Sequence, residues 1–330
     1  MRSWFRWCLA ILACLGLILW CMPAHAEPNK VVVVTYINKI QDLNFKEDKF
    51  ALDFFLWFRW ESRGALANYK PLETFELMNG KIESKSSIDE KKIGDINYAI
   101  VRVTAVISKT WDLERFPFDA HKMQIYVEES NFTAIDLVFE PYTVNSKLGN
   151  EIDMAGWTPD AFSAEVVKKG YESNYGDTSI PTGNKSEYSR FLINISIKRT
   201  NYGAAIKLLS TVLLAVAVAF AAFTVKSSNL DARFGMGVGA LFAVAASGFV
   251  AASAVPDAGS MTVADEMHMV ALGFIFASLC VSSYCLKMEQ AGREAIADRI
   301  DNVCKYSFPI VFYAWAFVTV WRALALWNPI

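Results

Sequence analysis

The sequence predicts a β-sandwich extracellular domain followed by an all-α four-helix transmembrane domain. Three observations lead to this prediction: an export signal at the N-terminus, a long region of short strand-like segments, and four apolar segments at the C-terminal end. Hydrophobic residues make up 54% of the 330 residues and charged residues only 20%, which is more apolar than an ordinary soluble protein. The formal net charge of -2 gives no indication of nucleic-acid binding, which needs concentrated positive charge.

Residues 1–26 have the pattern of a secretory signal peptide. Arg2 and Arg6 precede an apolar run over residues 8–20, and an A-x-A cleavage signal follows at residues 24–26. This order of a basic region, a short apolar core and a small-residue site is typical of secretion. We therefore expect the next domain to be exported from the cytoplasm.

Residues 27–200 are expected to form the β-sandwich. Short segments rich in β-branched and aromatic residues recur without a long amphipathic helix between them, which favours two packed sheets. These segments are 31–37, 50–60, 98–108, 123–127, 135–139, 161–167 and 191–197. None of the six cysteines falls in this region, so its own apolar core must hold it together. The Gly-, Ser- and Asn-rich residues 173–186 are expected at an exposed hairpin tip.

Residues 201–330 are expected to cross the membrane four times, because a spanning helix needs roughly 20 apolar residues. The predicted helices cover about 204–225, 234–254, 265–286 and 306–327. Lys and Arg gather in the first and third connections, so the positive-inside rule puts these on the cytoplasmic side. The sequence therefore predicts a multi-pass membrane protein with its N-terminal domain outside the cytoplasm. A capping box is expected at Thr262 and Asp265, and residues 288–301 are expected to be a short helical linker.

The second apolar segment has an unusual composition, rich in Gly and Ala. A helix there places one stripe of residues at alternating steps of three and four. One interpretation is a pore lining in which two aromatic rings close the pore by dewetting. The other is a small-residue helix that packs against its neighbours.

A specific resemblance begins at residues 111–119, with the sequence WDLERFPFD. This segment resembles the signature loop of the pentameric ligand-gated ion channels, the Cys-loop receptor superfamily, in a bacterial form without the disulfide. Lys109 and Met123 stand where the two bridging cysteines are found in other members. Residues 232–238 and the later Pro256 resemble the second helix of that family and the loop after it. The resemblance implies a homopentamer with ligands at subunit interfaces and the second helices around a central pore. It also implies a bacterial inner membrane, with the N-terminal domain in the periplasm.

The resemblance gives the stripe of the second helix a role as pore lining. We expect the pore to be lined by Asp231, Gly235, Gly239, Phe242, Ala246, Phe249 and Ser253. Phe242 is the expected main gate. A fivefold ring of Asp231 would favour cations, or Asp231 is simply the helix cap. Arg233 resembles the anion-selective branch of the family, unless its side chain points away from the pore.

The resemblance also implies a coupling layer between the two domains and a ligand site. The expected coupling residues are Asp42, Phe116, Pro117, Phe118, Asp119, Arg199 and Pro256, with Asp119 paired to Arg199. The expected ligand-binding residues are Trp57, Arg59, Glu129, Phe132, Tyr171, Tyr175 and Tyr188. Their rings could attract a cationic amine. Glu128 and Glu129 are expected either to sense protons or bind a cation, or to form a solvated strand edge.

No catalytic or metal-binding pattern is found in the sequence. His121 and His268 are expected to be isolated, and no nucleophile motif or phosphate-binding loop occurs. We therefore expect no enzyme activity, no cofactor and no metal. The expected partners are further copies of the chain, membrane lipid, a small-molecule or proton agonist and monovalent ions. The competing hypothesis is a non-conducting, membrane-anchored periplasmic sensor, because the stripe carries bulky Phe and few polar residues.

Overall fold

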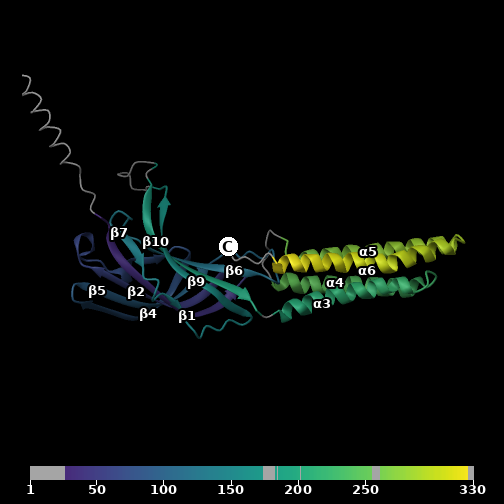
Figure 1. The fold of residues 1–330 in the computed structure, drawn as a ribbon, viewed down its shortest axis with the longest axis horizontal. Coiled ribbons are helices and arrows are strands. Elements are labelled where there is room, and N and C mark those ends of the chain that lie inside the picture. The colour runs from purple at the N-terminus through teal and green to yellow at the C-terminus, as the bar shows by residue number, and fades with distance from the viewer. Residues whose placement is uncertain (1–26, 174–182, 184, 201, 255–260, 326–330) are drawn as a thin grey trace, which may run out of the picture.

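The protein consists of two β-sheets followed by four long helices (Figure 1). A computed structural model describes residues 27–173, 183, 185–200, 202–254 and 261–325. The sheets form one end of an elongated molecule and the helices the other (Figure 1). The prediction of a strand-rich region followed by four apolar helices is confirmed. The expected signal peptide lies outside the described residues.

The first sheet has the strand order β4-β5-β2-β1-β7, and β8 also pairs with β1. Its strands are β1 (Asn29–Asn44), β2 (Lys49–Glu61), β4 (Gly80–Ile93), β5 (Ile96–Ser108), β7 (Leu137–Pro141) and β8 (Lys147–Leu148). Neighbours pair antiparallel except β7 and β8, which run parallel to β1. Alternate residues of β2 are fully buried, as expected for a strand with one face on a core.

The second sheet has the order β3-β6-β10-β9. Its strands are β3 (Phe75–Leu77), β6 (Ala120–Glu129), β9 (Trp157–Tyr171) and β10 (Ser186–Arg199). Two short helical turns, η1 (Gly64–Leu66) and α2 (Pro71–Thr74), connect β2 to β3. Strand β10 ends at the junction with the helices and so carries the chain from the sheets into the bundle (Figure 1).

A single apolar core joins the two sheets. Phe54 and Val101 from the first sheet belong to the same buried cluster as Ile125 and Ile193 from the second, and all four are 0% exposed. Each side chain of this size stabilises the fold by about 1.5–3 kcal/mol when fully buried. Apolar burial therefore holds this region together, as expected for a domain without cysteine.

Four helices follow the sheets, and each is long and apolar enough to cross a membrane. They are α3 (Gly203–Ala221), which continues as η2 (Ala222–Thr224), α4 (Leu230–Ala254), α5 (Val263–Gln290) and α6 (Glu294–Ala325). Helix α4 packs along α3 and α5, and α5 packs along α6. Edge-to-face contacts among Phe220, Phe274, Phe308 and Phe312 fill the core of this bundle.

Two helices begin earlier than the hydropathy pattern predicts. Helix α4 begins at Leu230 rather than at residue 234, and α6 begins at Glu294 rather than at residue 306. Residues 294–305, which mix charged and apolar side chains, are therefore part of α6. The expected linker over 288–301 is helical at both ends, but its residues belong to α5 up to Gln290 and to α6 from Glu294. Hydropathy marks only the apolar part of a helix, whereas charged residues with good helix propensity extend it.

The expected capping box at the start of α5 is confirmed. The Thr262 hydroxyl accepts a hydrogen bond from the Asp265 backbone N–H at 3.1 Å, and the Asp265 carboxylate accepts one from the Thr262 N–H at 3.0 Å. These bonds satisfy two N–H groups that have no partner within the helix. The first turn of α5 is thus fixed at the junction with the sheets.

Candidate functional site

Helix α4 has one buried face and one face that the rest of the chain leaves exposed. On the buried face Ala240 is 4% exposed and Val244 is 0% exposed. All seven residues of the predicted stripe are exposed: Asp231, Gly235, Gly239, Phe242, Ala246, Phe249 and Ser253. The structure therefore brings the whole predicted stripe to one face of α4.

The exposed face of α4 combines small residues with two uncovered rings. A Cβ atom added at Gly235 or Gly239 would meet no other atom within 4 Å. Phe242 is 68% exposed and Phe249 is 78% exposed. Large apolar rings are rarely left this exposed unless something outside the subunit covers them or they face lipid.

Arg233 points away from the exposed stripe and into the helix bundle. It is 1% exposed, and its Nη1 donates to Oδ1 of Asp301 in α6 at 2.9 Å. Its Nε donates to the carbonyl of Val225 at 2.8 Å, and Nη2 also contacts both Val225 and Asp301. Of the two interpretations of Arg233, the structure therefore supports the one in which its side chain lies away from the stripe.

His268 connects α5 to α4, so the expectation that it is isolated is wrong. Its Nδ1 lies 2.6 Å from the carbonyl oxygen of Ala264, and its Nε2 lies 3.1 Å from the hydroxyl of Ser247. A carbonyl only accepts, which assigns a hydrogen to Nδ1; in the neutral ring Nε2 is then the acceptor from Ser247. No pattern in the sequence indicates this contact, because Ser247 lies 21 residues away.

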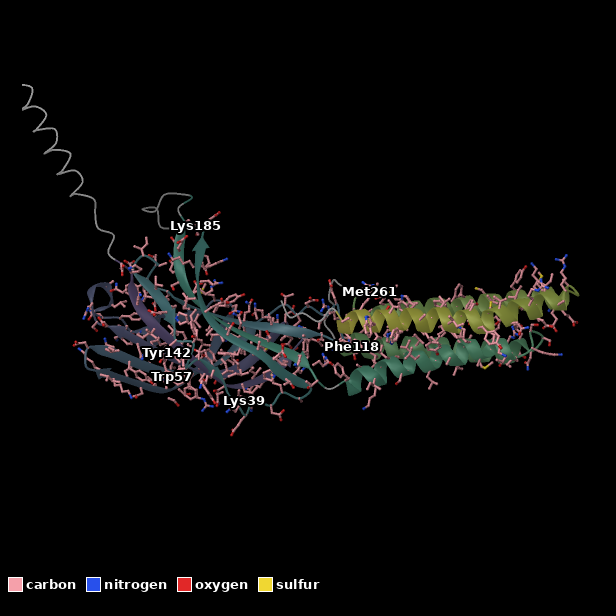
Figure 2. All side chains as sticks on the ribbon, in the orientation of Figure 1. Lys39, Trp57, Phe118, Tyr142, Lys185 and Met261 are labelled. Carbon is pink, nitrogen blue, oxygen red and sulfur yellow. The ribbon has the colours of Figure 1, made fainter. Side chains whose placement is uncertain are left out.

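The loop at residues 111–119 connects the sheets to the start of α5. The backbone N–H of Val263 donates to the carbonyl of Glu114 at 3.0 Å, and that of Ala264 donates to Phe116 at 3.1 Å. Phe118 packs against a buried cluster from the helices that includes Met267, and it lies at the junction in Figure 2. Two N–H groups in the first turn of α5 are thus satisfied by the 111–119 loop of the N-terminal region.

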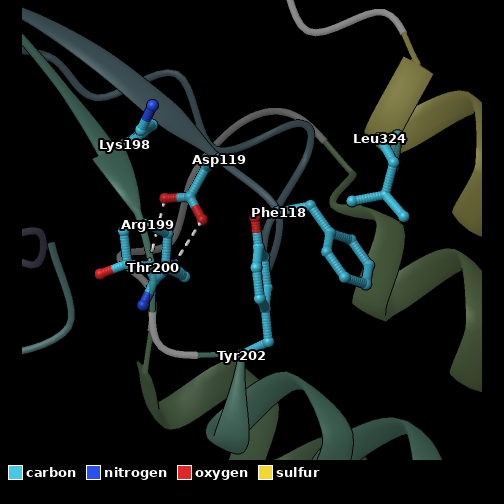
Figure 3. Close-up of a pocket in the computed structure, with 8 residues that line it drawn as sticks. Phe118, Asp119, Lys198, Arg199, Thr200, Tyr202 and Leu324 are labelled. Atoms are coloured by element: carbon cyan, nitrogen blue, oxygen red, sulfur yellow. Dashed lines mark hydrogen bonds and ion pairs between the residues drawn. The ribbon is translucent and has the colours of Figure 1, made fainter. Parts of the chain in front are cut away.

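The expected ion pair between Asp119 and Arg199 is confirmed (Figure 3). Arg199 Nε donates to Oδ1 at 2.9 Å and Nη2 donates to Oδ2 at 3.2 Å. His121 is also a partner, since its Nε2 lies 2.7 Å from Oδ2. Burial alone would raise the pKa of Asp119, but the hydrogen bonds from His121 and Arg199 outweigh it and hold the pKa below its ordinary value.

Aromatic rings enclose this ion pair. The Arg199 guanidinium lies 4.4 Å from the ring centre of Trp157. Phe45, in the loop between β1 and β2, has its ring centre 4.6 Å from that of Trp111 and 5.5 Å from that of His121. The β1–β2 loop and the 111–119 loop therefore pack on one aromatic cluster. The expectation that His121 is isolated is wrong, because it is part of this cluster.

A cavity of about 320 Å³ lies beside the pair, at the level where the sheets meet the helices. Phe118 and Tyr202 line it, with ring centres 6.1 Å apart, and Leu324 at the end of α6 closes another side (Figure 3). Of the other expected coupling residues, Pro117 is buried after a cis peptide bond and Asp42 is exposed. Pro256 lies outside the described residues.

The expected ligand-binding residues do not form one site within the chain. Trp57 and Arg59 lie on β2 in the first sheet. Trp57 stacks on Phe55 with ring centres 5.6 Å apart, and the Arg59 guanidinium lies 5.0 Å from the ring centre of Tyr142. Figure 2 shows Trp57 and Tyr142 together on this sheet. This group forms one aromatic surface with a cation beside it.

Tyr171 and Tyr188 lie on the second sheet, with ring centres 5.7 Å apart. The Tyr171 hydroxyl donates to Glu128 at 3.0 Å and accepts from Arg190 Nη2 at 2.9 Å. Arg190 also forms an ion pair with Glu128 and lies 4.5 Å from the ring centre of Tyr126. Arg190 is not among the residues expected from the sequence, although its spacing along β10 directs it to the same face as Tyr188.

Glu128 and Glu129 are both buried, so a solvated strand edge is the wrong description. They are 3% and 2% exposed. Glu129 accepts from the Tyr69 hydroxyl at 2.8 Å and from the Thr74 hydroxyl at 2.9 Å, and burial raises its pKa above the ordinary value. Phe132 packs on Tyr69 with ring centres 5.7 Å apart. Tyr175 lies outside the described residues.

Among the described residues, no group of three or more His, Cys, Asp or Glu side chains is arranged to hold a metal ion. No protein-family model matches the chain, and no curated protein matches it. The function therefore has to be inferred from the residues of this chain.

Proposed function

We propose that the protein is a homopentameric ligand-gated ion channel of a bacterial inner membrane, with the N-terminal sheets outside the cytoplasm. The observation that carries the proposal is the exposed stripe of α4. It begins with an acid, continues through small residues and includes two uncovered Phe side chains. Small residues let copies of one helix approach closely, and a ring of identical subunits puts the same stripe around one axis.

The charges near the start of α4 favour cation selectivity. Asp231 is exposed at the beginning of the stripe, whereas Arg233 is buried and paired with Asp301. In a pentamer, five Asp231 carboxylates would surround the mouth of the pore, and no Arg233 charge would oppose them there. A ring of acids at a constriction attracts cations and repels anions.

The two exposed Phe residues support a hydrophobic gate. Phe242 and Phe249 are seven positions apart, which is two helical turns, so in a pentamer they would make two stacked apolar rings. An apolar constriction of this kind blocks ions by excluding water. Phe242, nearer the middle of α4, is the proposed main gate.

Ligand binding is proposed at the interfaces between subunits. Each subunit carries Trp57 and Arg59 on one sheet and Tyr171 and Tyr188 on the other. One group from each of two neighbours would complete an aromatic site suited to a small molecule. A ligand that binds better to the open state would shift the closed–open equilibrium by that difference in affinity.

The junction supports transmission from the ligand site to the pore. The two backbone hydrogen bonds from the 111–119 loop to α5 and the packing of Phe118 make a short mechanical path. Helix α5 in turn bonds to α4 through His268 and Ser247. A displacement of the sheets would therefore be transmitted through α5 to α4, the proposed pore helix.

The test is planar-bilayer current from the purified full-length protein and from Phe242→Ala across an asymmetric KCl gradient. We expect Phe242→Ala to open more easily or to leak, because it removes the apolar ring. Phe317→Ala is the matched control, because Phe317 is also exposed, at 67%, but lies on α6. It should leave the current unchanged.

The outcomes separate the proposal from its rival. Current that reverses near the potassium potential supports a cation channel, and Asp231→Asn should then move the reversal potential. Reversal near the chloride potential would support a channel but contradict the proposed cation selectivity. Silence from both the wild type and Phe242→Ala, in a sample shown to be pentameric, would favour the non-conducting sensor.

A further inference from the structure

The N-terminal part of α6 supplies a counter-charge to the proposed pore helix. Asp301 lies in the stretch 294–305 that continues α6 beyond its apolar part, and it is 7% exposed. Its carboxylate pairs with Arg233 of α4 through both guanidinium Nη atoms. Figure 1 shows that α4 and α6 both begin at the end of the bundle away from the sheets.

Arg233 also fixes the connection between α3 and α4. Its Nε donates to the carbonyl of Val225, which follows η2, at 2.8 Å. One guanidinium thus joins the end of α3, the start of α4 and the start of α6. Planar guanidinium groups suit such shared, two-pronged recognition. The first turn of α4, which carries Asp231, is held by this contact.

We propose that Asp301 is a specificity-determining residue of the channel, acting through Arg233. Asp301 neutralises Arg233 and holds its guanidinium inside the bundle. Of the two charged residues in the first turn of α4, Asp231 and Arg233, ions then meet only Asp231. The inference rests on the proposed function. It assigns a role in ion selectivity to a residue on α6, a helix outside the proposed pore lining.

The physical reason is that a buried guanidinium without a counter-charge is unstable. If Asp301 is replaced by Asn, the long Arg233 side chain gains hydration free energy by turning toward water at the mouth of the proposed pore. Its charge then lies two residues from Asp231. A unit charge about 6 Å from another in water changes its energy by about one RT, equivalent to about a threefold change in a permeability ratio. Anions would then be less strongly excluded.

The other charged groups near this end have different surroundings. Glu289 of α5 accepts a hydrogen bond from Ser227. Lys226 in the α3–α4 connection and Asp298 of α6 are exposed. Asp298→Asn removes the same charge from the same helix, one turn from Asp301, and is therefore a matched control.

A purely structural role of the ion pair makes a different prediction. If Asp301 acts by neutralising Arg233, the double variant Arg233→Gln with Asp301→Asn should regain the selectivity that Asp301→Asn loses. If the pair only stabilises the bundle, removing both partners should not restore selectivity. This is the logic of a double-mutant cycle.

The experiment measures reversal potentials of full-length channels in planar bilayers across a KCl gradient, after each variant is shown to be pentameric. We expect Asp301→Asn to lower the potassium-to-chloride permeability ratio at least about threefold, the effect of one RT. The double variant and Asp298→Asn should remain within twofold of the wild type. Arg233→Gln alone should not lower the ratio.

Several results would overturn the inference. An unchanged ratio in pentameric Asp301→Asn, or an equal loss in Asp298→Asn or the double variant, refutes it while the channel itself stands. If Asp301→Asn fails to assemble, a lowered ratio in Arg233→Gln or in the double variant still refutes it, and an unchanged ratio in both supports it. If the wild type and Phe242→Ala are both silent, the proposed function fails first and the inference falls with it.

Discussion

Replacing Arg199 by Met should destabilise the region where the sheets meet the helices. Met keeps most of the apolar stem of Arg but removes the guanidinium, with its charge and its donors. Asp119 would then remain buried without its main cation, since its side chain is 1% exposed and that of Arg199 is 16% exposed. The loss should appear as a lower midpoint of thermal unfolding.

The size of the effect follows from the geometry of the pair. Removing one partner of a buried ion pair typically costs about 3–5 kcal/mol. His121 still contacts Asp119, and Arg199 is partly in water, so the lower end, about 3 kcal/mol, applies here. For a unit of 150–250 residues, each kcal/mol shifts the midpoint by roughly 2–4 °C. The expected decrease is therefore about 6–12 °C.

The pH dependence has a defined sign. Because the pKa of Asp119 is held below its ordinary value in the folded protein, the pair stabilises the fold at pH values above the unfolded pKa of about 3.9. This contribution is lost as the pH falls through the folded pKa. The difference between wild type and Arg199→Met should thus be constant from about pH 7 to pH 5 and narrow below about pH 4.

The measurement is thermal unfolding of the full-length protein in detergent, followed by tryptophan fluorescence, because Trp157 lies against Arg199. The control is Lys198→Met, which removes the adjacent cation. Lys198 pairs with Asp160, and these side chains are 38% and 24% exposed, so the loss should be at most about 1 kcal/mol. Equal midpoints for Arg199→Met and Lys198→Met would refute the reasoning.

Three further predictions concern local structure, and each is checked by the same unfolding assay. Thr262→Ala removes the N-cap of α5 and should cost about 0.5–2 kcal/mol, whereas Thr262→Ser should cost little. Gly80→Ala should destabilise, because its Cβ would lie 2.7 Å from a backbone carbonyl oxygen and 2.5 Å from Ile107; a midpoint equal to the wild type would contradict this. Tyr69→Phe takes a donor from the buried Glu129 and should cost about 1–3 kcal/mol. That loss should shrink as the pH falls through the Glu129 pKa, so a pH-independent loss would argue against it.

The sequence alone determined the elements and the exposed stripe. Segments rich in β-branched and aromatic residues predicted strands such as β2, and runs of about 20 apolar residues predicted four helices. The residues from Asp231 to Ser253 could be assigned to one face, because helical periodicity is a local property. The Asp119–Arg199 pair was predicted through the family resemblance of the 111–119 loop and not through periodicity.

Tertiary structure decided what lies opposite each polar residue. Periodicity did not determine that Arg233 turns inward to Asp301, because that partner is 68 residues away on a stretch of α6 expected to be a linker. Glu128 and Glu129 are buried for the same reason, since Arg190 and Tyr69 reach them from other segments. A buried charge needs a partner. In these cases the partner comes from a segment far away in the chain, and the sequence pattern does not show which distant segments meet.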